Sequence, residues 1–172
     1  VRGDLNLGAT GTVTEVFPDG RFVAFGHPFL GAGELELPVA PAEIVGVVPS
    51  LFQSFKLANG GEPRFRLTND RDSGVGGRMD RAASTVPVTV AVEAPGRVPR
   101  ELRFEVAANS KLLPVLAGLV ADASMNAADP TPRERLLSFR VALDTAAGEI
   151  AYEDAAAGLR AREAAVLSVV AL

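Results

Sequence analysis

The sequence contains no cysteine and no tryptophan, and it has one histidine among its 172 residues. Without thiols the chain has neither disulfides nor cysteine nucleophiles. One imidazole cannot supply the nitrogen and sulfur ligands of a transition-metal site. We therefore expect no metal and no cofactor. The single histidine, His27, is the one side chain whose unperturbed acid–base chemistry operates near neutral pH.

The chain also has no large excess of one charge and no long apolar run. The formal charge is −4 and the pI is near 5.1, and basic residues do not cluster with aromatic ones, which argues against nucleic acid as a partner. The longest apolar stretches, 112–121 and 164–172, are too short to cross a bilayer. The chain begins at Val1 with neither an initiator methionine nor a signal peptide, so we expect a piece of a longer polypeptide.

Alternation of apolar and polar residues predicts mainly antiparallel β-structure between residues 10 and 107. The clearest strands are Val86–Val92 and Leu102–Val106. Two stretches rich in glycine and turn-forming residues, Gly31–Pro41 and Asn69–Gly77, are expected to be loops. The first ten residues are expected to form a lead-in without regular structure.

The period changes after residue 110, where one apolar stripe predicts a helix near 111–125. Asn109 or Ser110 is the expected cap, and Pro114 fits only the first turn. A hairpin should follow from Leu137–Leu143 and Glu149–Glu153. The alanine-rich segment Ala155–Leu172 should form a closing helix.

Together these elements predict a mainly β, β-rich α+β fold. It would consist of an antiparallel, partly closed β-barrel, followed by a C-terminal β-hairpin and two helices. We expect two regions: 1–95, the barrel region that carries His27, and 96–172, an α/β extension packed on it, which could also be one continuous domain.

His27 stands at the end of the predicted strand Arg21–His27, within the stretch Arg21–Phe29, RFVAFGHPF. Strand ends are a common position for functional residues, because the sheet holds them rigidly while the following loop exposes them. Gly26 permits unusual backbone dihedrals directly before the imidazole, and Pro28 favours extended geometry at His27. Two interpretations stay open at this point: a general base, or a structural histidine whose nitrogens bond to nearby backbone.

Asp72-Ser73-Gly74 invites comparison with the nucleophile segment of chymotrypsin-like proteases. Only 46 positions separate His27 from Ser73, too few to complete one barrel and enter a second. The segment also lacks the glycine-rich context that forms an oxyanion hole. We therefore interpret Ser73 as a loop residue rather than a nucleophile.

Four segments occur in an order that resembles a known family. They are Gly11-Thr12-Val13-Thr14, Phe25-Gly26-His27-Pro28-Phe29, Pro49–Ala58 with its Ser-Phe-Lys-Leu-Ala string, and Asp70-Arg71 followed by Gly74-Val75-Gly76-Gly77. Over residues 1–95 the chain resembles the SpoIVB-type (stage IV sporulation protein B) serine peptidases, particularly the large bacterial members outside sporulation. The resemblance implies a trypsin-like β-barrel, an extracytoplasmic or cell-envelope location, and a protein or peptide substrate.

The resemblance also implies roles for particular residues. The Gly-His segment of the family supplies the catalytic base, which maps onto His27. The nucleophile segment, Gly-x-Ser-Gly-Ser-Pro, is absent from this sequence, and in the larger relatives it lies upstream. That missing segment of the same polypeptide is then an expected partner. Asp70 and Asp72 are candidates for the acid, without an assigned role.

Two hypotheses of different classes follow from the sequence. In the first, the chain is the base-bearing part of a serine endopeptidase and is inactive by itself. In the second, it is a structural or protein-binding β-domain that has kept the fold without the chemistry.

Overall fold

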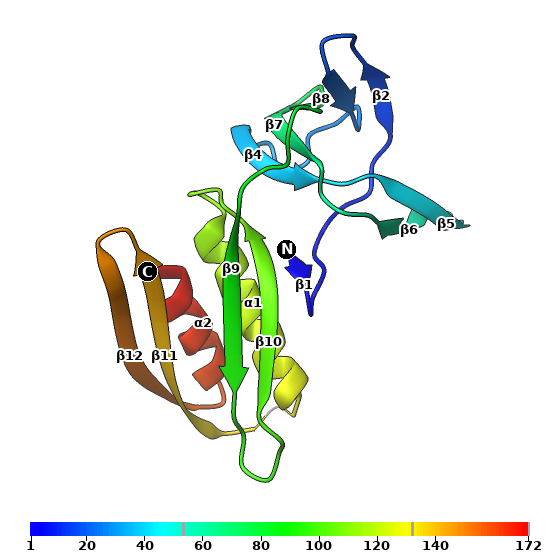
Figure 1. Ribbon diagram of the computed structural model, residues 1–172. Helices are drawn as coiled ribbons and strands as arrows, with labels where there is room; N and C mark the ends of the chain where they lie inside the picture. The colour runs from blue at the N-terminus through cyan, green and yellow to red at the C-terminus, as the bar shows by residue number, and fades with distance from the viewer. Residues whose placement is uncertain (53, 132, 172) are drawn as a thin grey trace. The chain divides into compact units, whose positions relative to one another are not determined.

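The computed structural model describes residues 1–52, 54–131 and 133–171 and shows a mainly β chain, with 47% of residues in strands and two helices (Figure 1). The predicted predominance of antiparallel β-structure is confirmed. The chain divides into two compact units. The histidine unit comprises residues 7–86 and 107–109, and the helical unit comprises residues 1–6, 87–106 and 110–172. The expected division into 1–95 and 96–172 stays a prediction.

The main sheet of the histidine unit has five antiparallel strands in the order β2-β3-β8-β7-β4. Their bounds are β2 Val13–Val16, β3 Arg21–Ala24, β4 Gly33–Val39, β7 Phe65–Arg71 and β8 Gly74–Arg78. β2 and β4 are the two edges of this sheet, so the strands that the structure describes form an open sheet and not a closed barrel.

Two expected loops of this unit are strands. Residues 33–39 form β4, in which Leu35 is buried while Glu34 is exposed. Pro38 is tolerated because β4 is an edge strand and need not donate a hydrogen bond on its outer side. The stretch 69–77 is the end of β7, a two-residue turn at Asp72-Ser73, and most of β8. The loop predictions for Gly31–Pro41 and Asn69–Gly77 are therefore wrong over most of their lengths.

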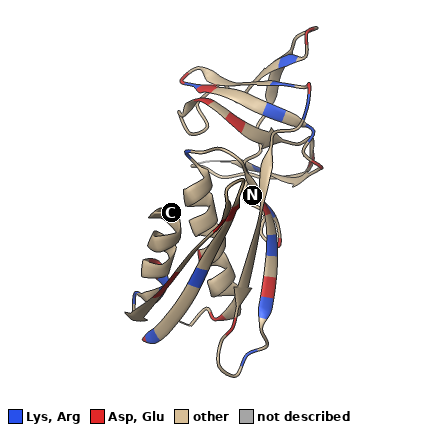
Figure 2. Cartoon of the chain, turned by 60° about the vertical axis from the view of Figure 1, so that its left-hand side comes forward, with Lys and Arg blue, Asp and Glu red and all other residues tan. Residues whose placement is uncertain are grey.

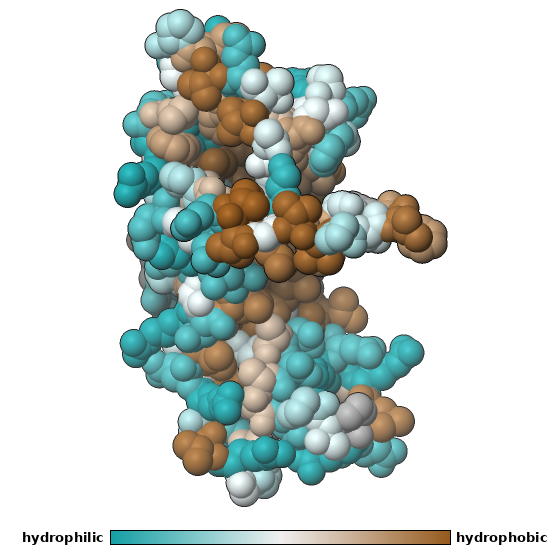
Figure 3. Space-filling model, turned by 90° about the vertical axis from the view of Figure 1, so that its right-hand side faces the viewer, coloured by the Kyte–Doolittle hydropathy of each residue, from teal (hydrophilic) through white to brown (hydrophobic). Residues whose placement is uncertain are grey.

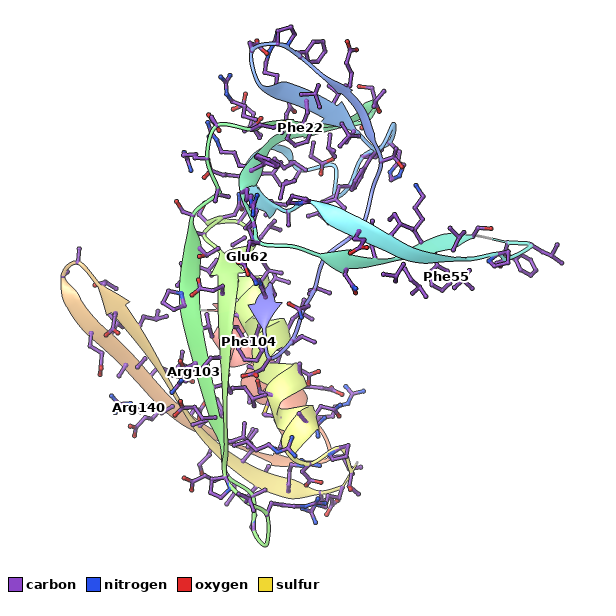
Figure 4. All side chains as sticks on the ribbon, turned by 45° about the vertical axis from the view of Figure 1, so that its right-hand side comes forward. Phe22, Phe55, Glu62, Arg103, Phe104 and Arg140 are labelled. Carbon is purple, nitrogen blue, oxygen red and sulfur yellow. The ribbon has the colours of Figure 1, made fainter. Side chains whose placement is uncertain are left out.

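A close approach between neighbouring strands explains why β8 is rich in glycine. Phe22 on β3 is paired with Gly77 on β8. A Cβ atom at position 77 would lie 2.2 Å from Phe22 Cζ and 2.5 Å from the carbonyl oxygen of Arg66. The ring therefore occupies the space that a side chain at position 77 would need. Phe22, labelled in Figure 4, is one of the buried core residues of this unit.

A two-stranded antiparallel sheet forms a separate arm of the histidine unit (Figure 1). It consists of β5, Ala42–Val48, and β6, Phe55–Gly60. Unlike the main sheet, the arm has no further strand beside it among the described residues.

The helical unit contains a three-stranded sheet in the order β1-β10-β9, a long hairpin and both helices. Its elements are β1 Arg2–Gly3, β9 Thr85–Val92 (whose first two residues belong to the histidine unit), β10 Arg100–Ala107 (whose last residue belongs to the histidine unit), α1 Leu113–Ala128, β11 Arg135–Thr145, β12 Gly148–Gly158 and α2 Ala161–Ala171. The strands predicted at Val86–Val92, Leu102–Val106 and Leu137–Leu143 are confirmed. The prediction that the first ten residues lack regular structure is wrong for Arg2 and Gly3, which form β1 and pair with β10.

The alanine-rich end of the chain differs from its prediction. β12 continues through Gly158, where it pairs with Arg135 of β11, and only then does α2 begin. Eleven paired positions on β11 outweigh the helix propensity of the alanines at 155–157. The predicted closing helix at Ala155–Leu172 is therefore wrong for its first residues, and Leu172 lies outside the described residues.

Helix α1 is confirmed, but its cap is not the expected one. The N-cap is Leu112, which makes no side-chain capping hydrogen bond, and a proline stands in the first turn as predicted. The helix packs against α2 at Gly118, where a Cβ atom would lie 2.5 Å from Val170 Cγ2. The core of this unit joins Phe104 and Val106 of β10 to α1 (Figure 4).

Charged residues of both signs are distributed over the strands, whereas the helices are largely uncharged (Figure 2). In the histidine unit, the Arg66 guanidinium on β7 donates to Glu36 at 2.9 Å and to Asp80 at 2.8 Å. The hydrogen bonds from Arg66 to Asp80 hold the pKa of the Asp80 carboxyl well below its usual range. The network connects β4 and β7 at the surface.

Candidate functional site

The loop that carries His27 begins with two consecutive residues in the left-handed region. β3 ends at Ala24, and Phe25 and Gly26 both have φ of +74°. Phe25 is the one described residue other than glycine with a positive φ. Its backbone N–H donates to the carbonyl oxygen of Thr12 at 3.0 Å, and Gly26 N–H donates to Ala24 at 3.0 Å. The chain therefore leaves the sheet sharply, and His27 is exposed on the loop that follows.

The imidazole of His27 makes one hydrogen bond, in which Nδ1 lies 2.7 Å from the carbonyl oxygen of Pro28. A carbonyl oxygen can only accept, so Nδ1 carries the proton. In the neutral ring, Nε2 then holds the lone pair. Within the described part of the chain, no hydrogen bond to Nε2 is found. This tautomer is the one in which the exposed nitrogen can accept a proton.

One aromatic ring, that of Phe25, neighbours the imidazole and in turn contacts a second ring. The Phe25 ring lies 5.5 Å from the His27 ring, centroid to centroid, and meets the Phe29 ring edge-on at 6.0 Å. The Phe25 ring packs directly against Gly11, since a Cβ atom on Gly11 would lie 1.5 Å from Phe25 Cε1. The absence of a side chain at position 11 therefore makes room for the ring that neighbours His27.

Asp70 fixes the segment that follows the histidine. Its carboxylate is 1% exposed and accepts hydrogen bonds from the backbone N–H groups of Phe29 at 2.8 Å, Leu30 at 2.7 Å and Ala32 at 3.3 Å. Burial alone would raise the pKa of Asp70, but these N–H groups outweigh it and bring the pKa below its ordinary value. The carboxylate therefore holds the loop, and no hydrogen bond between Asp70 and His27 is found among the described residues.

The other candidates from the sequence are less closely involved. Asp72 and Ser73 form the exposed turn between β7 and β8. Gly74, directly after them, does approach the histidine loop: a Cβ atom there would lie 2.9 Å from the Ala24 carbonyl oxygen and 3.4 Å from the Gly26 nitrogen. No hydrogen bond between Ser73 and His27 is found in the described residues.

A lysine connects the arm to the same loop. The Nζ atom of Lys56 on β6 donates to Thr12 Oγ1 at 2.8 Å, and Thr12 in turn accepts the Phe25 N–H through its carbonyl oxygen. Elsewhere in the same segment, the Ser50 N–H donates to Ser54 Oγ at 3.1 Å. The sequence analysis did not predict a role for Lys56. The feature that could have indicated one is that Lys56 is the one charged residue between Glu43 and Glu62.

Three of the four segments of the family resemblance thus meet around one loop, residues 25–32, which contains the fourth. Gly11 and Thr12, Lys56, and the hairpin residues Asp70 and Gly74 each contact it directly or through one partner. The contacts are with backbone or with Phe25, so they fix the position of the loop and leave the imidazole edge exposed. The arrangement can present a base, and in the described part of the chain no serine or threonine hydroxyl is hydrogen-bonded to His27.

Comparisons with family models, curated proteins and solved structures find no match to this chain. Among the described residues, no group of three or more histidine, cysteine or acidic side chains could hold a metal ion. In the same residues, no helix is long and apolar enough to span a bilayer.

Proposed function

We propose that this chain supplies the general base of a serine endopeptidase of the SpoIVB type, with His27 as the base and the nucleophilic serine on the upstream Gly-x-Ser-Gly-Ser-Pro segment of the same polypeptide. In this reaction, Nε2 of His27 takes the proton of the serine hydroxyl as its oxygen attacks the peptide carbonyl. The same nitrogen then gives that proton to the departing amine. The substrate is a protein or peptide, and the proposed location is extracytoplasmic.

The observation that carries the proposal is the state of the imidazole. Nδ1 donates to the Pro28 carbonyl oxygen at 2.7 Å, and no hydrogen bond to the opposite nitrogen, Nε2, is found among the described residues. A general base needs one nitrogen oriented by a protein acceptor and the other available to the hydroxyl. The rigid loop supports the same assignment, because a base must be held in position before the substrate arrives.

The orienting acceptor in this chain is a carbonyl rather than a carboxylate. A carbonyl selects the required tautomer but does not neutralise the imidazolium that forms during the reaction, so it stabilises that state less than an aspartate would. Asp70 is already saturated by backbone N–H groups. We therefore propose that the acid, like the serine, comes from outside these residues. The relation to a trypsin-like barrel belongs to the same proposal.

A second candidate function is a structural or protein-binding β-domain. It is favoured by the roles of the resembling residues, since Gly11, Asp70 and Gly74 all act on the backbone or on packing around the loop. Such roles would keep the loop intact whether or not His27 reacts.

Turnover by the complete polypeptide distinguishes the two functions. His27→Ala should lower peptide hydrolysis by about 10⁴-fold or more while leaving the unfolding midpoint unchanged, because the side chain is exposed and holds no other element. Asp144→Ala, at an exposed position of β11, is the matched control and should retain turnover. Unchanged hydrolysis in His27→Ala, or no hydrolysis by the native polypeptide, would favour the binding domain.

A further inference from the structure

The outer end of the arm exposes its apolar side chains fully. Leu51 and Phe52, between β5 and β6, are 103% and 100% exposed. Figure 3 shows the arm projecting from the surface with an apolar end. Because these residues lie in the connection and not on a strand, neither β5 nor β6 covers them. Two adjacent large apolar side chains in this position contact water over their whole surface.

The strands of the arm are apolar on both faces. The register pairs Val48 with Phe55 on one face and Val47 with Lys56 on the other. Phe55 is 53% exposed and Val47 is 61% exposed (Figure 4 labels Phe55). A folded partner would cover one face and leave the other in water, where polar residues would be expected. Exposed apolar residues on both faces and at the end favour a medium that contacts the arm on more than one side.

The charge of the arm is consistent with such a medium. No acidic residue lies between Glu43 and Glu62, although the chain has 21 aspartates and glutamates. The one charge in that interval is Lys56, whose ammonium group donates to Thr12 Oγ1 at 2.8 Å. Carboxylates are costly in hydrocarbon and are repelled by anionic headgroups, so their absence here, in an acidic chain, removes both obstacles.

We propose that the arm is a lipid-surface anchor, in which Leu51 and Phe52 insert into the boundary between headgroups and acyl chains of a phospholipid bilayer. The inference goes beyond the peptidase proposal and does not depend on it. The arm would enter only this boundary region and would not cross the bilayer. Removing both side chains should weaken partitioning by more than about tenfold, because each large apolar group leaving water contributes on that scale.

Cosedimentation with vesicles tests the anchor. The native chain should sediment with phosphatidylcholine vesicles, with or without phosphatidylglycerol, and the double variant Leu51→Ser/Phe52→Ser should lose that binding by more than about tenfold. The matched control is Val98→Ser/Leu159→Ser, since these residues are 84% and 71% exposed but lie in the helical unit. The control should bind as the native chain does, and circular dichroism should be the same for all three proteins.

Three results would overturn the proposal. The first is no vesicle binding by the native chain, and the second is equal loss of binding in both double variants. The third is a concentration-dependent dimer in light scattering that Leu51→Ser/Phe52→Ser abolishes while vesicle binding is absent. In that case, a second copy of the chain covers the arm.

Discussion

The backbone N–H of Leu30 donates to Oδ2 of Asp70 at 2.7 Å, which joins two residues that are 40 positions apart in the sequence. Asp70 is buried on a central strand of the sheet, and Leu30 is on the exposed histidine loop. A short polar side chain on a rigid strand thus replaces the regular pairing that the loop lacks. The position of His27 depends on this bond and on its two companions to Phe29 and Ala32.

Replacing Asp70 with asparagine should destabilise the histidine unit. The amide group offers one acceptor oxygen in place of two and turns its NH₂ toward a backbone donor, so we expect a loss of about 2–3 kcal/mol in the free energy of unfolding. Urea denaturation followed by circular dichroism measures it. Asp72→Asn, on the exposed turn, should change the free energy by less than about 0.5 kcal/mol. Equal effects of the two substitutions would contradict the role of Asp70.

The contribution of Asp70 should disappear in acid. Its pKa is lower in the folded chain than the ordinary value of about 4, so the unfolded chain takes up the proton first as the pH falls. The stabilisation is therefore complete above the unfolded pKa and is lost as the pH falls through the folded pKa. The difference in unfolding free energy between the native chain and Asp70→Asn should be constant near neutral pH and shrink below about pH 4. A difference independent of pH would contradict this.

Gly77 and Gly46 should respond oppositely to a methyl group. At Gly77 the new Cβ atom would meet the Phe22 ring and the Arg66 carbonyl oxygen, whereas at Gly46 nothing lies within 4 Å. Gly77→Ala should cost about 1–3 kcal/mol or more through overpacking. Gly46→Ala should be neutral or slightly stabilising, because the methyl group meets no neighbour and alanine can adopt the backbone conformation there. Neither glycine has a positive φ, so backbone strain does not explain the difference. Thermal unfolding of the two variants provides the comparison, and similar midpoints would exclude the proposed contact between Phe22 and β8.

The alternation of apolar and polar residues predicted the strands that bury their own apolar side chains, such as 86–92 and 102–106. It failed for strands that are stabilised mainly by residues of an adjacent strand. β8 contains three glycines in five residues, and it is a strand because Phe22 of β3 covers it. The alanines at 155–157 are extended because β11 pairs with them. Both segments are extended because of residues that are distant in the sequence, so local propensity could not predict either strand.

The candidate site shows the same division. The position of His27 at the end of a strand followed from Gly26 and Pro28, and the structure places His27 on the loop directly after β3. The function of Asp70 did not follow, because an aspartate in a glycine-rich stretch is equally typical of a turn. Only the fold places its carboxylate beneath the N–H groups of the histidine loop.

The tautomer of His27 can be measured directly. Because the Pro28 carbonyl oxygen accepts from Nδ1, we expect the neutral ring to carry its proton on Nδ1. Nitrogen-15 chemical shifts of the imidazole, recorded at alkaline pH, distinguish the two forms. Predominance of the Nε2-protonated form would remove the geometric basis for a general base at this position.

The most direct measurement of the central claim is serine labelling by a fluorophosphonate in the complete polypeptide, since this reagent reacts with a serine whose proton is taken by a neighbouring base. We expect labelling in the Gly-x-Ser-Gly-Ser-Pro segment, its loss in His27→Ala, and unchanged labelling in Ser73→Ala. The chain of 172 residues alone should not react. Labelling that persists in His27→Ala, or that depends on Ser73, would contradict the assignment of His27 as the base for an upstream serine.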